Sequence, residues 1–311
     1  MKALTRRARK DHWRYQDIVR EHGIKQAGYK GEQSLDYYMD FLPKTNPPFS
    51  IFQDLRLPHT KESFFQMDNT LLHPNFMLIL EVKNYKGTLS FDPKFQQVIQ
   101  EVENNPLLSL PDPILQVKMQ EMKLIQWMKS KNLPLLPIER LIVMVNPKAV
   151  IKVDSLHGLV ERHVIKAPAL HDRIQNYLKK YPDQILSKKD YKRISSLFIK
   201  EDTPSETSPI IQFGIIPSDI IPGVFCQRCI TTSPMTWHHG KWLCKHCSFV
   251  SATAHLPALE DYALLISPTI NNKELRRYLL LDKPHTARRI IQSSGADYIN
   301  STQGTFYTIK I

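Results

Sequence analysis

The sequence contains no apolar run that approaches the roughly 20 residues of a membrane-spanning helix. Its first ten residues are basic and lack the apolar segment of a signal peptide, so secretion is not expected and we predict a cytoplasmic protein. Cysteine is also scarce, because the chain has only four and all lie in two Cys-x-x-Cys pairs. In a reducing cytosol this pattern favours a bound metal over disulfide bonds.

The chain does contain enough material for two or three folded domains. Its 311 residues are 42% hydrophobic and 23% charged, as in a soluble globular protein. Lysine and arginine number 42 against 30 aspartates and glutamates, which gives a formal net charge of +12. This excess predicts a polyanionic partner, with nucleic acid the first candidate, and no role at a membrane. The alternative is that the charge serves solubility alone.

The stretch Leu78–Gly87 places an acid and a base inside an apolar run that predicts a strand buried on both faces. Glu81 and Lys83 are two positions apart, so on a strand they point to the same side. Upstream, Asp68 ends a shorter apolar segment, and a hairpin between the two segments would bring it beside Glu81. Because buried charges are costly unless paired or bound to metal, the three side chains predict a site for a divalent cation and a phosphate. The alternative is a purely structural ion-pair cluster.

Together these residues resemble the nuclease-related domain (NERD) family of bacteria, within the Asp/Glu-x-Lys nuclease superfamily. The resemblance covers roughly residues 28–150 and includes further pieces in the same order: Gly31-Glu32, Gln66-Met67-Asp68, Glu81-Val82-Lys83-Asn84, Gly87, Asp112-Pro113 and Gln116. Two positions depart from the family pattern. Asn69 stands where histidine is common, and Asp112 where asparagine is common.

The resemblance implies an α/β fold with a restriction-endonuclease-like core, a mixed β-sheet flanked by helices. It also implies a metal-dependent nuclease, a phosphodiesterase that hydrolyses DNA. Asp68 and Glu81, with the backbone carbonyl of Val82, would hold Mg²⁺ or Mn²⁺, and Lys83 would position the attacking water or stabilise charge on the phosphate. The alternative is a catalytically inactive nucleic-acid-binding adaptor in DNA processing, since activity does not follow from fold.

Two outer residues complete the site that the resemblance implies. Glu32 would be an outer member, although a carboxylate in the first turn of a helix is also favoured by the helix dipole alone. Gln116 would support the site from the next helix, although a lone helical glutamine is more often exposed.

The pattern of apolar residues gives the order of elements. We expect a basic amphipathic helix over 1–22, a turn at Gly28–Gly31, and a helix from Glu32 to Leu42. Strands are expected at 50–57, 64–72, 77–83 and 87–91, then a helix at 115–128, a strand at 140–146 and a helix over 171–199.

Two Cys-x-x-Cys pairs, Cys226 with Cys229 and Cys244 with Cys247, are separated by fourteen residues. This spacing predicts a structural Zn²⁺ site of the ribbon kind. A segment of about 30 residues buries too little apolar surface to fold without its metal.

The C-terminal residues predict a small helical module. Helices are expected at 259–266, 269–281 and 285–294, followed by a hairpin over 298–311. This order is typical of a helix-turn-helix, perhaps winged, whose Arg288 and Arg289 would face DNA phosphates or base edges. The alternative is a three-helix unit that does not touch DNA.

The predicted domain order follows from these patterns. We expect a nuclease-related domain with the basic N-terminal helix at 1–200, a linker at 201–222, a zinc ribbon at 223–253 and a helix-turn-helix-like module at 254–311.

Overall fold

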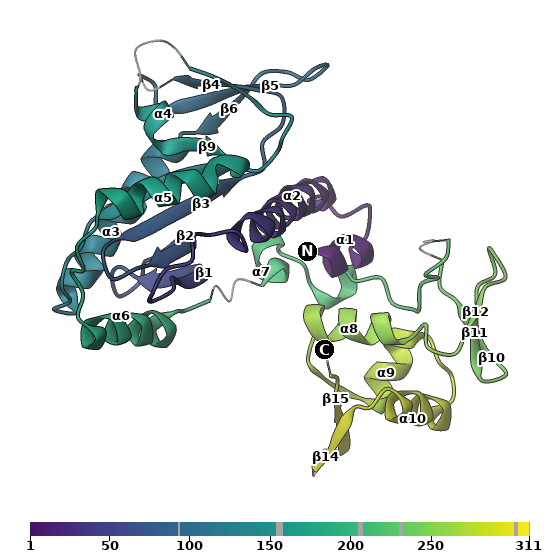
Figure 1. Cartoon of the computed structure of the whole chain (residues 1–311). Coiled ribbons are helices and arrows are strands. Elements are labelled where there is room, and N and C mark those ends of the chain that lie inside the picture. Colours follow the sequence, from purple (N-terminus) through teal and green to yellow (C-terminus); the bar gives the residue numbers. More distant parts are fainter. Residues whose placement is uncertain (93, 154–157, 205–207, 230–232, 302–303, 311) are drawn as a thin grey trace. The chain divides into compact units, whose positions relative to one another are not determined.

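The computed structural model describes the chain except for residues 93, 154–157, 205–207, 230–232, 302–303 and 311 (Figure 1). The chain forms two compact units. The central unit is Lys25–Glu206, and the composite unit joins Met1–Ile24 to Thr207–Ile311. In the part of the chain that the structure describes, no helix is long and apolar enough to cross a membrane.

The central unit is built on a mixed five-stranded sheet of order β1-β2-β3-β7-β9. Its strands are β1 (Ser50–Pro58), β2 (Phe64–Leu72), β3 (Met77–Lys83), β7 (Ile138–Met144) and β9 (Val164–Lys166). Strands β1, β2 and β3 run antiparallel to one another, whereas β7 and β9 run parallel to β3. The structure thereby confirms the predicted mixed sheet, and strands β2, β3 and β7 lie where strands were expected.

Helices cover both faces of this sheet. On one face, α3 (Pro113–Ser130) packs against β7, β3 and β2, α6 (Lys188–Glu201) packs against β1, and the short α4 (Gly158–His163) packs against β7 and β9. On the other face lie α5 (Leu170–Lys180) and the part of α2 (Tyr15–Met39) within this unit, while a 3₁₀ turn at Ala167–Ala169 leads into α5. Because both faces are covered, the run from Met77 to Leu80 is wholly buried.

A second sheet of order β6-β5-β4-β8 follows β3. It consists of β4 (Thr88–Asp92), β5 (Gln97–Glu101), β6 (Leu108–Pro111) and β8 (Val150–Lys152), of which only β4 was expected. Gly87 leads into β4 with a φ of 76°, and a Cβ there would lie 2.1 Å from the carbonyl oxygen of Glu101. Glycine is therefore required at this position.

Two helix predictions were wrong. Helix α2 runs unbroken from Tyr15 to Met39, so Gly28–Gly31 form no turn and Glu32 does not lie in a first helical turn. Glycine costs only about 1 kcal/mol inside a helix, and here packing outweighs it. The helix expected over 171–199 is two helices, α5 and α6, because Pro182 lies between them and cannot continue the first.

The composite unit begins with α1 (Lys2–Arg7) and the start of α2, so the helix predicted over 1–22 is interrupted. The short α7 (Pro209–Phe213) and a 3₁₀ turn at Pro217–Asp219 occupy part of the predicted linker, whose residues 205–207 lie outside the described residues. Leu4 and Ile18 belong to the same buried cluster as Trp242 and Leu259. The compact units thus group the N-terminal residues with the C-terminal ones, not with the nuclease-related domain as expected. The four-part division itself stays a prediction.

The rest of the composite unit holds a small antiparallel sheet and a helical module. The sheet contains β10 (Thr236–His238), β11 (Lys241–Leu243) and β12 (Val250–Ser251). The module contains α8 (Leu256–Leu265), β13 (Thr269–Asn271), α9 (Asn272–Leu279), α10 (Pro284–Ser293), β14 (Asp297–Ser301) and β15 (Gly304–Thr308). Its sheet order is β13-β15-β14. Three helices with this antiparallel sheet form the winged arrangement that the sequence predicted.

Candidate functional site

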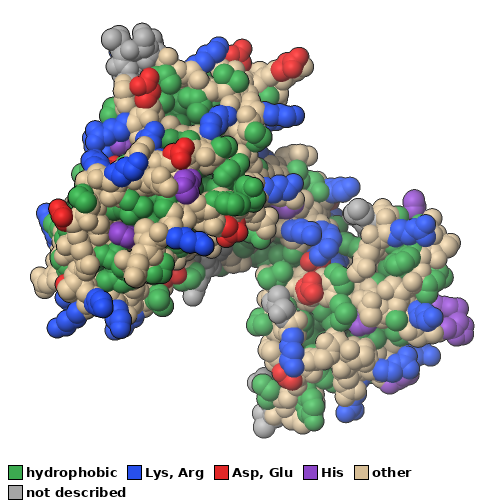
Figure 2. Space-filling view, viewed as in Figure 1, with side chains coloured by type: hydrophobic (Ala, Val, Ile, Leu, Met, Phe, Trp, Pro, Cys, Tyr) green, Lys and Arg blue, Asp and Glu red, His purple; other side chains and the backbone are tan. Residues whose placement is uncertain are grey.

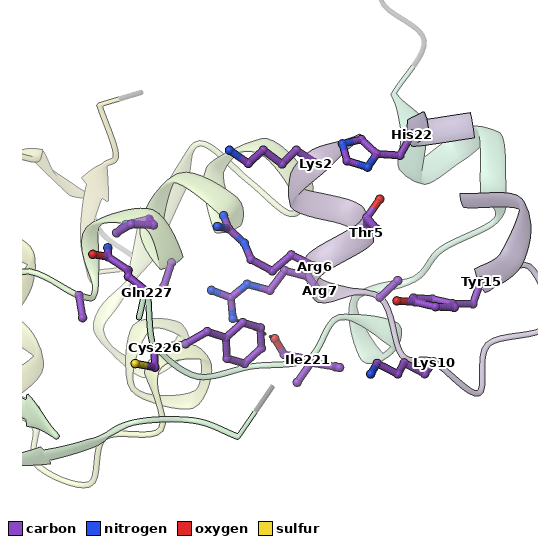
Figure 3. Close-up of a pocket in the computed structure, with 15 residues that line it drawn as sticks. Lys2, Thr5, Arg6, Arg7, Lys10, Tyr15, His22, Ile221, Cys226 and Gln227 are labelled. Atoms are coloured by element: carbon purple, nitrogen blue, oxygen red, sulfur yellow. Dashed lines mark hydrogen bonds between the residues drawn. The ribbon is translucent and has the colours of Figure 1, made fainter. Parts of the chain in front are cut away.

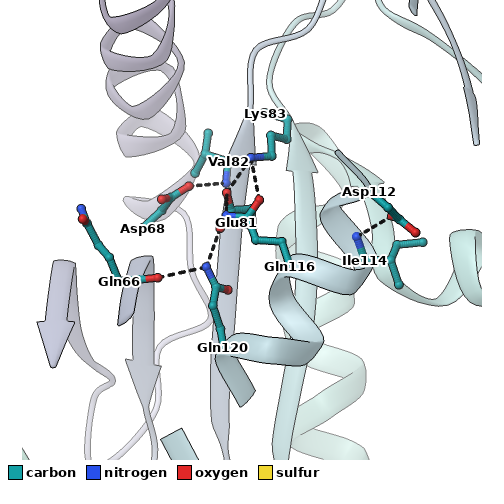
Figure 4. Close-up of polar contacts among 9 residues, drawn as sticks. All are labelled: Gln66, Asp68, Glu81, Val82, Lys83, Asp112, Ile114, Gln116 and Gln120. Carbon is teal, nitrogen blue, oxygen red and sulfur yellow. Dashed lines mark hydrogen bonds and ion pairs between the residues drawn. The ribbon is translucent and has the colours of Figure 1, made fainter. Parts of the chain in front are cut away.

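The β2–β3 hairpin brings two carboxylates together at one end of the central sheet (Figure 4). Asp68 comes from β2, and its Oδ2 accepts a hydrogen bond of 2.9 Å from the backbone N–H of Val82 on β3. Glu81, the residue before Val82, is only 2% exposed. The structure therefore places Asp68 beside Glu81, as the apolar segments predicted.

The buried carboxylate of Glu81 has three hydrogen-bond donors. Its Oε1 accepts from Lys83 Nζ at 2.6 Å and from Gln116 Nε2 at 2.6 Å. Its Oε2 accepts from Gln120 Nε2 at 2.9 Å. Lys83 Nζ also donates to Gln116 Oε1 at 3.1 Å, which closes a small network between β3 and α3.

Gln120 was not predicted as a site residue. It lies one helical turn after Gln116, so both amides face β3 from the same side of α3. Its Nε2 also donates to the backbone carbonyl of Gln66 at 3.1 Å, which ties α3 to β2. The four-residue spacing of the two glutamines was a usable signal in the sequence.

The start of α3 explains why both glutamines reach Glu81. The side chain of Asp112 caps the helix by accepting a hydrogen bond of 2.8 Å from the backbone N–H of Ile114, and Pro113 occupies the first helical turn. Aspartate and asparagine are equally good in this capping position. The departure of Asp112 from the family pattern therefore preserves the cap.

Gly31 allows α2 to pack closely against the end of β3. A Cβ at this position would lie 2.8 Å from Asn84 Cβ, and Asn84 Nδ2 donates to the carbonyl of Ala27 at 2.9 Å. Glu32 is the next residue on α2, and its charge is felt by both Asp68 and Glu81. Partial burial and the nearby acidic groups raise the pKa of Glu32. Because Glu32 lies inside the helix, the dipole explanation for it no longer applies.

Asp68 and Glu81 together carry more negative charge than Lys83 compensates. Burial, and then the charge of Glu81, raise the pKa of Asp68 to about 7. For Lys83, burial acts to lower the pKa, but the charge of Glu81 and its hydrogen bond outweigh burial, so that the pKa is raised. Lys83 is therefore a cation at neutral pH, whereas Asp68 is held in a place that disfavours its ionised form.

Glu32 does not complete a three-acid metal cage with this pair. Within the described residues, the one group of three or more His, Cys, Asp or Glu side chains close enough to hold a metal ion is formed by Cys226, Cys229, Cys244 and Cys247. Glu32 is thus an outer neighbour of Asp68 and Glu81.

The four cysteines of the composite unit are positioned to hold a metal ion. Their sulfur atoms all lie within 4.8 Å of one another, and the pairs Cys226–Cys247 and Cys229–Cys244 are each 3.6 Å apart. A disulfide requires about 2.05 Å, whereas thiolates around one tetrahedral Zn²⁺ lie roughly 3.8 Å apart. Backbone N–H groups of Cys247 and His246 lower the pKa of Cys244 to about 6, which favours the thiolate form that a metal needs.

Arg288 and Arg289 lie on the outer face of α10. Both are exposed, whereas Ala287, Ile290 and Ile291 on the same helix are buried in the core. Their guanidinium groups are therefore available to a partner. Figure 2 shows lysine and arginine side chains spread over the visible face of both units.

A mixed sheet between helices, with two acids and a lysine at the end of its central strands, defines a nuclease-like α/β domain. Consistent with this class, residues 27–145 match the family model of the nuclease-related domain (NERD). The match begins just before Gly31 and ends just after β7, so it contains every residue of the Asp68–Glu81 cluster. The chain therefore contains a nuclease-related domain. No curated protein and no solved structure gives a significant match.

Proposed function

We propose that this protein is a metal-dependent nuclease that hydrolyses phosphodiester bonds of DNA. The observation that carries the proposal is the cluster of Asp68, Glu81 and Lys83 in the nuclease-related domain, with Gln116 bonded to two of its members. It combines ligands for a hard cation with a fixed positive charge, which are the elements that phosphodiester hydrolysis needs.

The donor set suits Mg²⁺ or Mn²⁺. Asp68 uses Oδ2 for the Val82 N–H, and its Oδ1 has no partner among the described residues. Glu81 accepts three hydrogen bonds, and a carboxylate has about four acceptor positions, so one remains. Mg²⁺ commonly takes one or two carboxylates and keeps several waters. The carbonyl of Val82 would be a further ligand, and a bound cation would polarise the scissile phosphate and relieve the repulsion between the acids.

Lys83 acts in this proposal as a permanent cation. Its raised pKa favours the ammonium form, so it would stabilise charge on the phosphate or orient the attacking water, and it would not act as a base at neutral pH. Gln116 holds both Lys83 and Glu81 in place. Glu32 lies near Asp68 and Glu81 and, when ionised, adds to the negative potential that attracts a cation.

The composite unit would bind the nucleic acid in this proposal. Zn²⁺ would join the two Cys-x-x-Cys pairs into a ribbon, and the exposed Arg288 and Arg289 of α10 would contact DNA phosphates or base edges. The net charge of +12 supports a polyanionic substrate.

The cleavage test uses purified full-length chain with plasmid and linear single strands, with added Mg²⁺, added Mn²⁺ or no added divalent cation. Asp68→Asn should lower the rate at least about a hundredfold, because it removes one preorganised charge. Asp183→Asn is the matched control, since Asp183 is an exposed aspartate of the same unit. Absence of cation-dependent cleavage by the parent protein would contradict the proposal.

The DNA-binding role of α10 has a separate test. Affinity for duplex DNA should fall steeply with salt, and the double variant Arg288→Ala and Arg289→Ala should flatten the slope of log K against log salt by about 1 to 2, one unit per lost phosphate contact. An unchanged slope would remove α10 from the DNA-binding surface.

One observation favours the adaptor alternative. Glu81 is already paired with Lys83 and hydrogen-bonded by two glutamines, so its charge is compensated without any added cation. If this reading is correct, the protein binds DNA but does not cleave it under any of the cation conditions above.

A further inference from the structure

A cavity of about 440 Å³ lies along α1 in the composite unit (Figure 3). Its size falls within the range of small-ligand pockets. Part of its wall is apolar and is formed by Ala8, Ile221, Phe225, Pro257 and Ala258. The cavity therefore offers a surface on which a flat organic group could pack.

The polar part of the wall is positively charged. Lys2, Arg6, Arg7 and Lys10 all line the cavity, and none of the described residues lining it is acidic. No hydrogen bond or ion pair links the ammonium groups of Lys2 and Lys10 to a described residue, and both residues are exposed. These charges are available to an anion.

Arg6 and Arg7 share a single counter-charge. The buried Asp261 binds Arg7 Nε through Oδ2 at 2.7 Å and also pairs with Arg6 Nη2 through Oδ1. Arg7 is held in place, because its Nη1 also donates to the carbonyls of Ile221 and Gly223. One carboxylate against two guanidinium groups leaves one net positive charge beside the cavity.

Arg6 carries an unused donor at this place. Its Nε is buried and has no hydrogen-bond partner among the residues that the structure describes. A buried N–H without an acceptor is costly, so the arrangement is incomplete as it stands. An anion in the cavity would supply the missing charge, and Tyr15, which also lines it, would offer a hydroxyl and an aromatic ring.

We propose that this cavity binds a nucleoside monophosphate unit, with the phosphate at Arg6 and Lys2 and the base against the apolar wall (Figure 3). The unit could be a free nucleotide or the phosphorylated end of a strand, which share this chemistry. The site is independent of the proposed catalysis, since it lies in the other unit and uses none of its residues.

The test is calorimetric titration of the full zinc-loaded chain, without added Mg²⁺, with deoxyadenosine 5′-monophosphate, deoxyadenosine, inorganic phosphate, and a short single strand with or without a 5′ phosphate. The nucleotide or the phosphorylated strand should bind at least about tenfold more tightly than the ligands lacking either phosphate or base, because charge-assisted hydrogen bonds and the apolar wall act together. Binding of the nucleotide identifies a free ligand, and binding of only the phosphorylated strand identifies a strand end.

Variants locate the site. Lys2→Gln and Arg6→Gln should each weaken binding about tenfold or more, whereas Lys273→Gln, at an exposed lysine of the same unit outside the cavity, should not. Lys2 makes no side-chain hydrogen bond or ion pair with a described residue, so Lys2→Gln stays informative if Arg6→Gln lowers the melting temperature. The proposal is overturned if neither the nucleotide nor the phosphorylated strand binds more tightly than the ligands that lack phosphate or base, or if Asp68→Asn in the acid cluster abolishes binding while Lys2→Gln leaves it unchanged.

Discussion

At the scale of single residues, Asp68 and Glu81 differ in how their charges are compensated. Glu81 has Lys83 and two glutamine amides as donors, whereas Asp68 accepts one hydrogen bond from the Val82 backbone. Asp68 is therefore the acid that a cation would benefit most. It is also the cleaner position for mutation, because Lys83→Met would leave Glu81 buried without its cation and cost about 3–5 kcal/mol whether or not the site is catalytic.

The pKa of Asp68 predicts a pH-dependent stability in the absence of divalent cations. Its folded-state pKa of about 7 lies above its usual 3.8, so folding favours the protonated form. The stability that this proton contributes is fully present below about pH 4 and is lost as the pH rises through about 7. Asp68→Asn should therefore melt at a higher temperature than the parent at about pH 8, and the difference should shrink toward about pH 5.

Added Mg²⁺ provides the complementary measurement. At about pH 8 it should raise the melting temperature of the parent but not of Asp68→Asn, since a ligand stabilises only the state that binds it. Asp183→Asn should follow the parent under both conditions. Identical pH profiles for parent and Asp68→Asn would show that Asp68 is not held in the strained charge state described above.

At the scale of elements, two helices place the outer residues of the cluster. Asp112 fixes the start of α3 and with it the positions of Gln116 and Gln120. On α2, Gly31 brings the helix against Asn84 and so places Glu32 near the acids. Asp112 and Gly31, which belong to the family pattern but do not contact Glu81 themselves, thus position the helices that carry the residues around it.

Two glycines of α2 should respond oppositely to the same substitution. Gly31→Ala would put a Cβ 2.8 Å from Asn84 Cβ, so α2 must shift, at a cost of about 1–3 kcal/mol. Gly28→Ala meets nothing within 4 Å and should stabilise the protein by about 0.5–1 kcal/mol through better helix propensity. Denaturant unfolding of both variants measures the contrast. Equal effects of the two substitutions would mean that α2 does not pack against β3 at Gly31.

At the scale of the whole molecule, the composite unit depends on contacts between the two ends of the chain. Arg7 reaches Asp261 across 254 positions of sequence, and its guanidinium lies 4.1 Å from the ring centre of Phe225. The cysteine cluster follows directly at Cys226. A metal there would therefore stabilise a region that also holds the N-terminal helix.

Metal removal should be visible in this unit. We expect one Zn²⁺ per chain, and a chelator should release it and expose Trp242, which is fully buried and packs against Trp237 at 5.0 Å between ring centres. The measurement is zinc content together with a red shift of tryptophan emission. Cys244→Ser should reproduce the shift, whereas freshly purified protein without zinc, or with a disulfide between Cys226 and Cys229, would refute the site.

The sequence by itself determined those features whose chemistry is local. The apolar run around Glu81 and Lys83 favours a buried strand by its length and composition. The spacing of the four cysteines predicts a metal site without tertiary information, because it is the spacing of zinc ligands in a ribbon. The strands 64–72 and 77–83 were also predicted with the bounds that the structure has. In each case the physical requirement is met within a few neighbouring residues.

Only the tertiary structure decided which distant groups satisfy one another. Gln120 was not assigned to the site from the sequence, because only the fold shows that α3, which begins at the Asp112 cap, directs this amide toward Glu81. Gly28–Gly31 looked like a turn, since the contact with Asn84 that outweighs glycine's low helix propensity lies some fifty positions away. The N-terminal helix belongs with the C-terminal residues because the buried charge of Asp261 needs a partner, and Arg7 is the one that the fold brings to it.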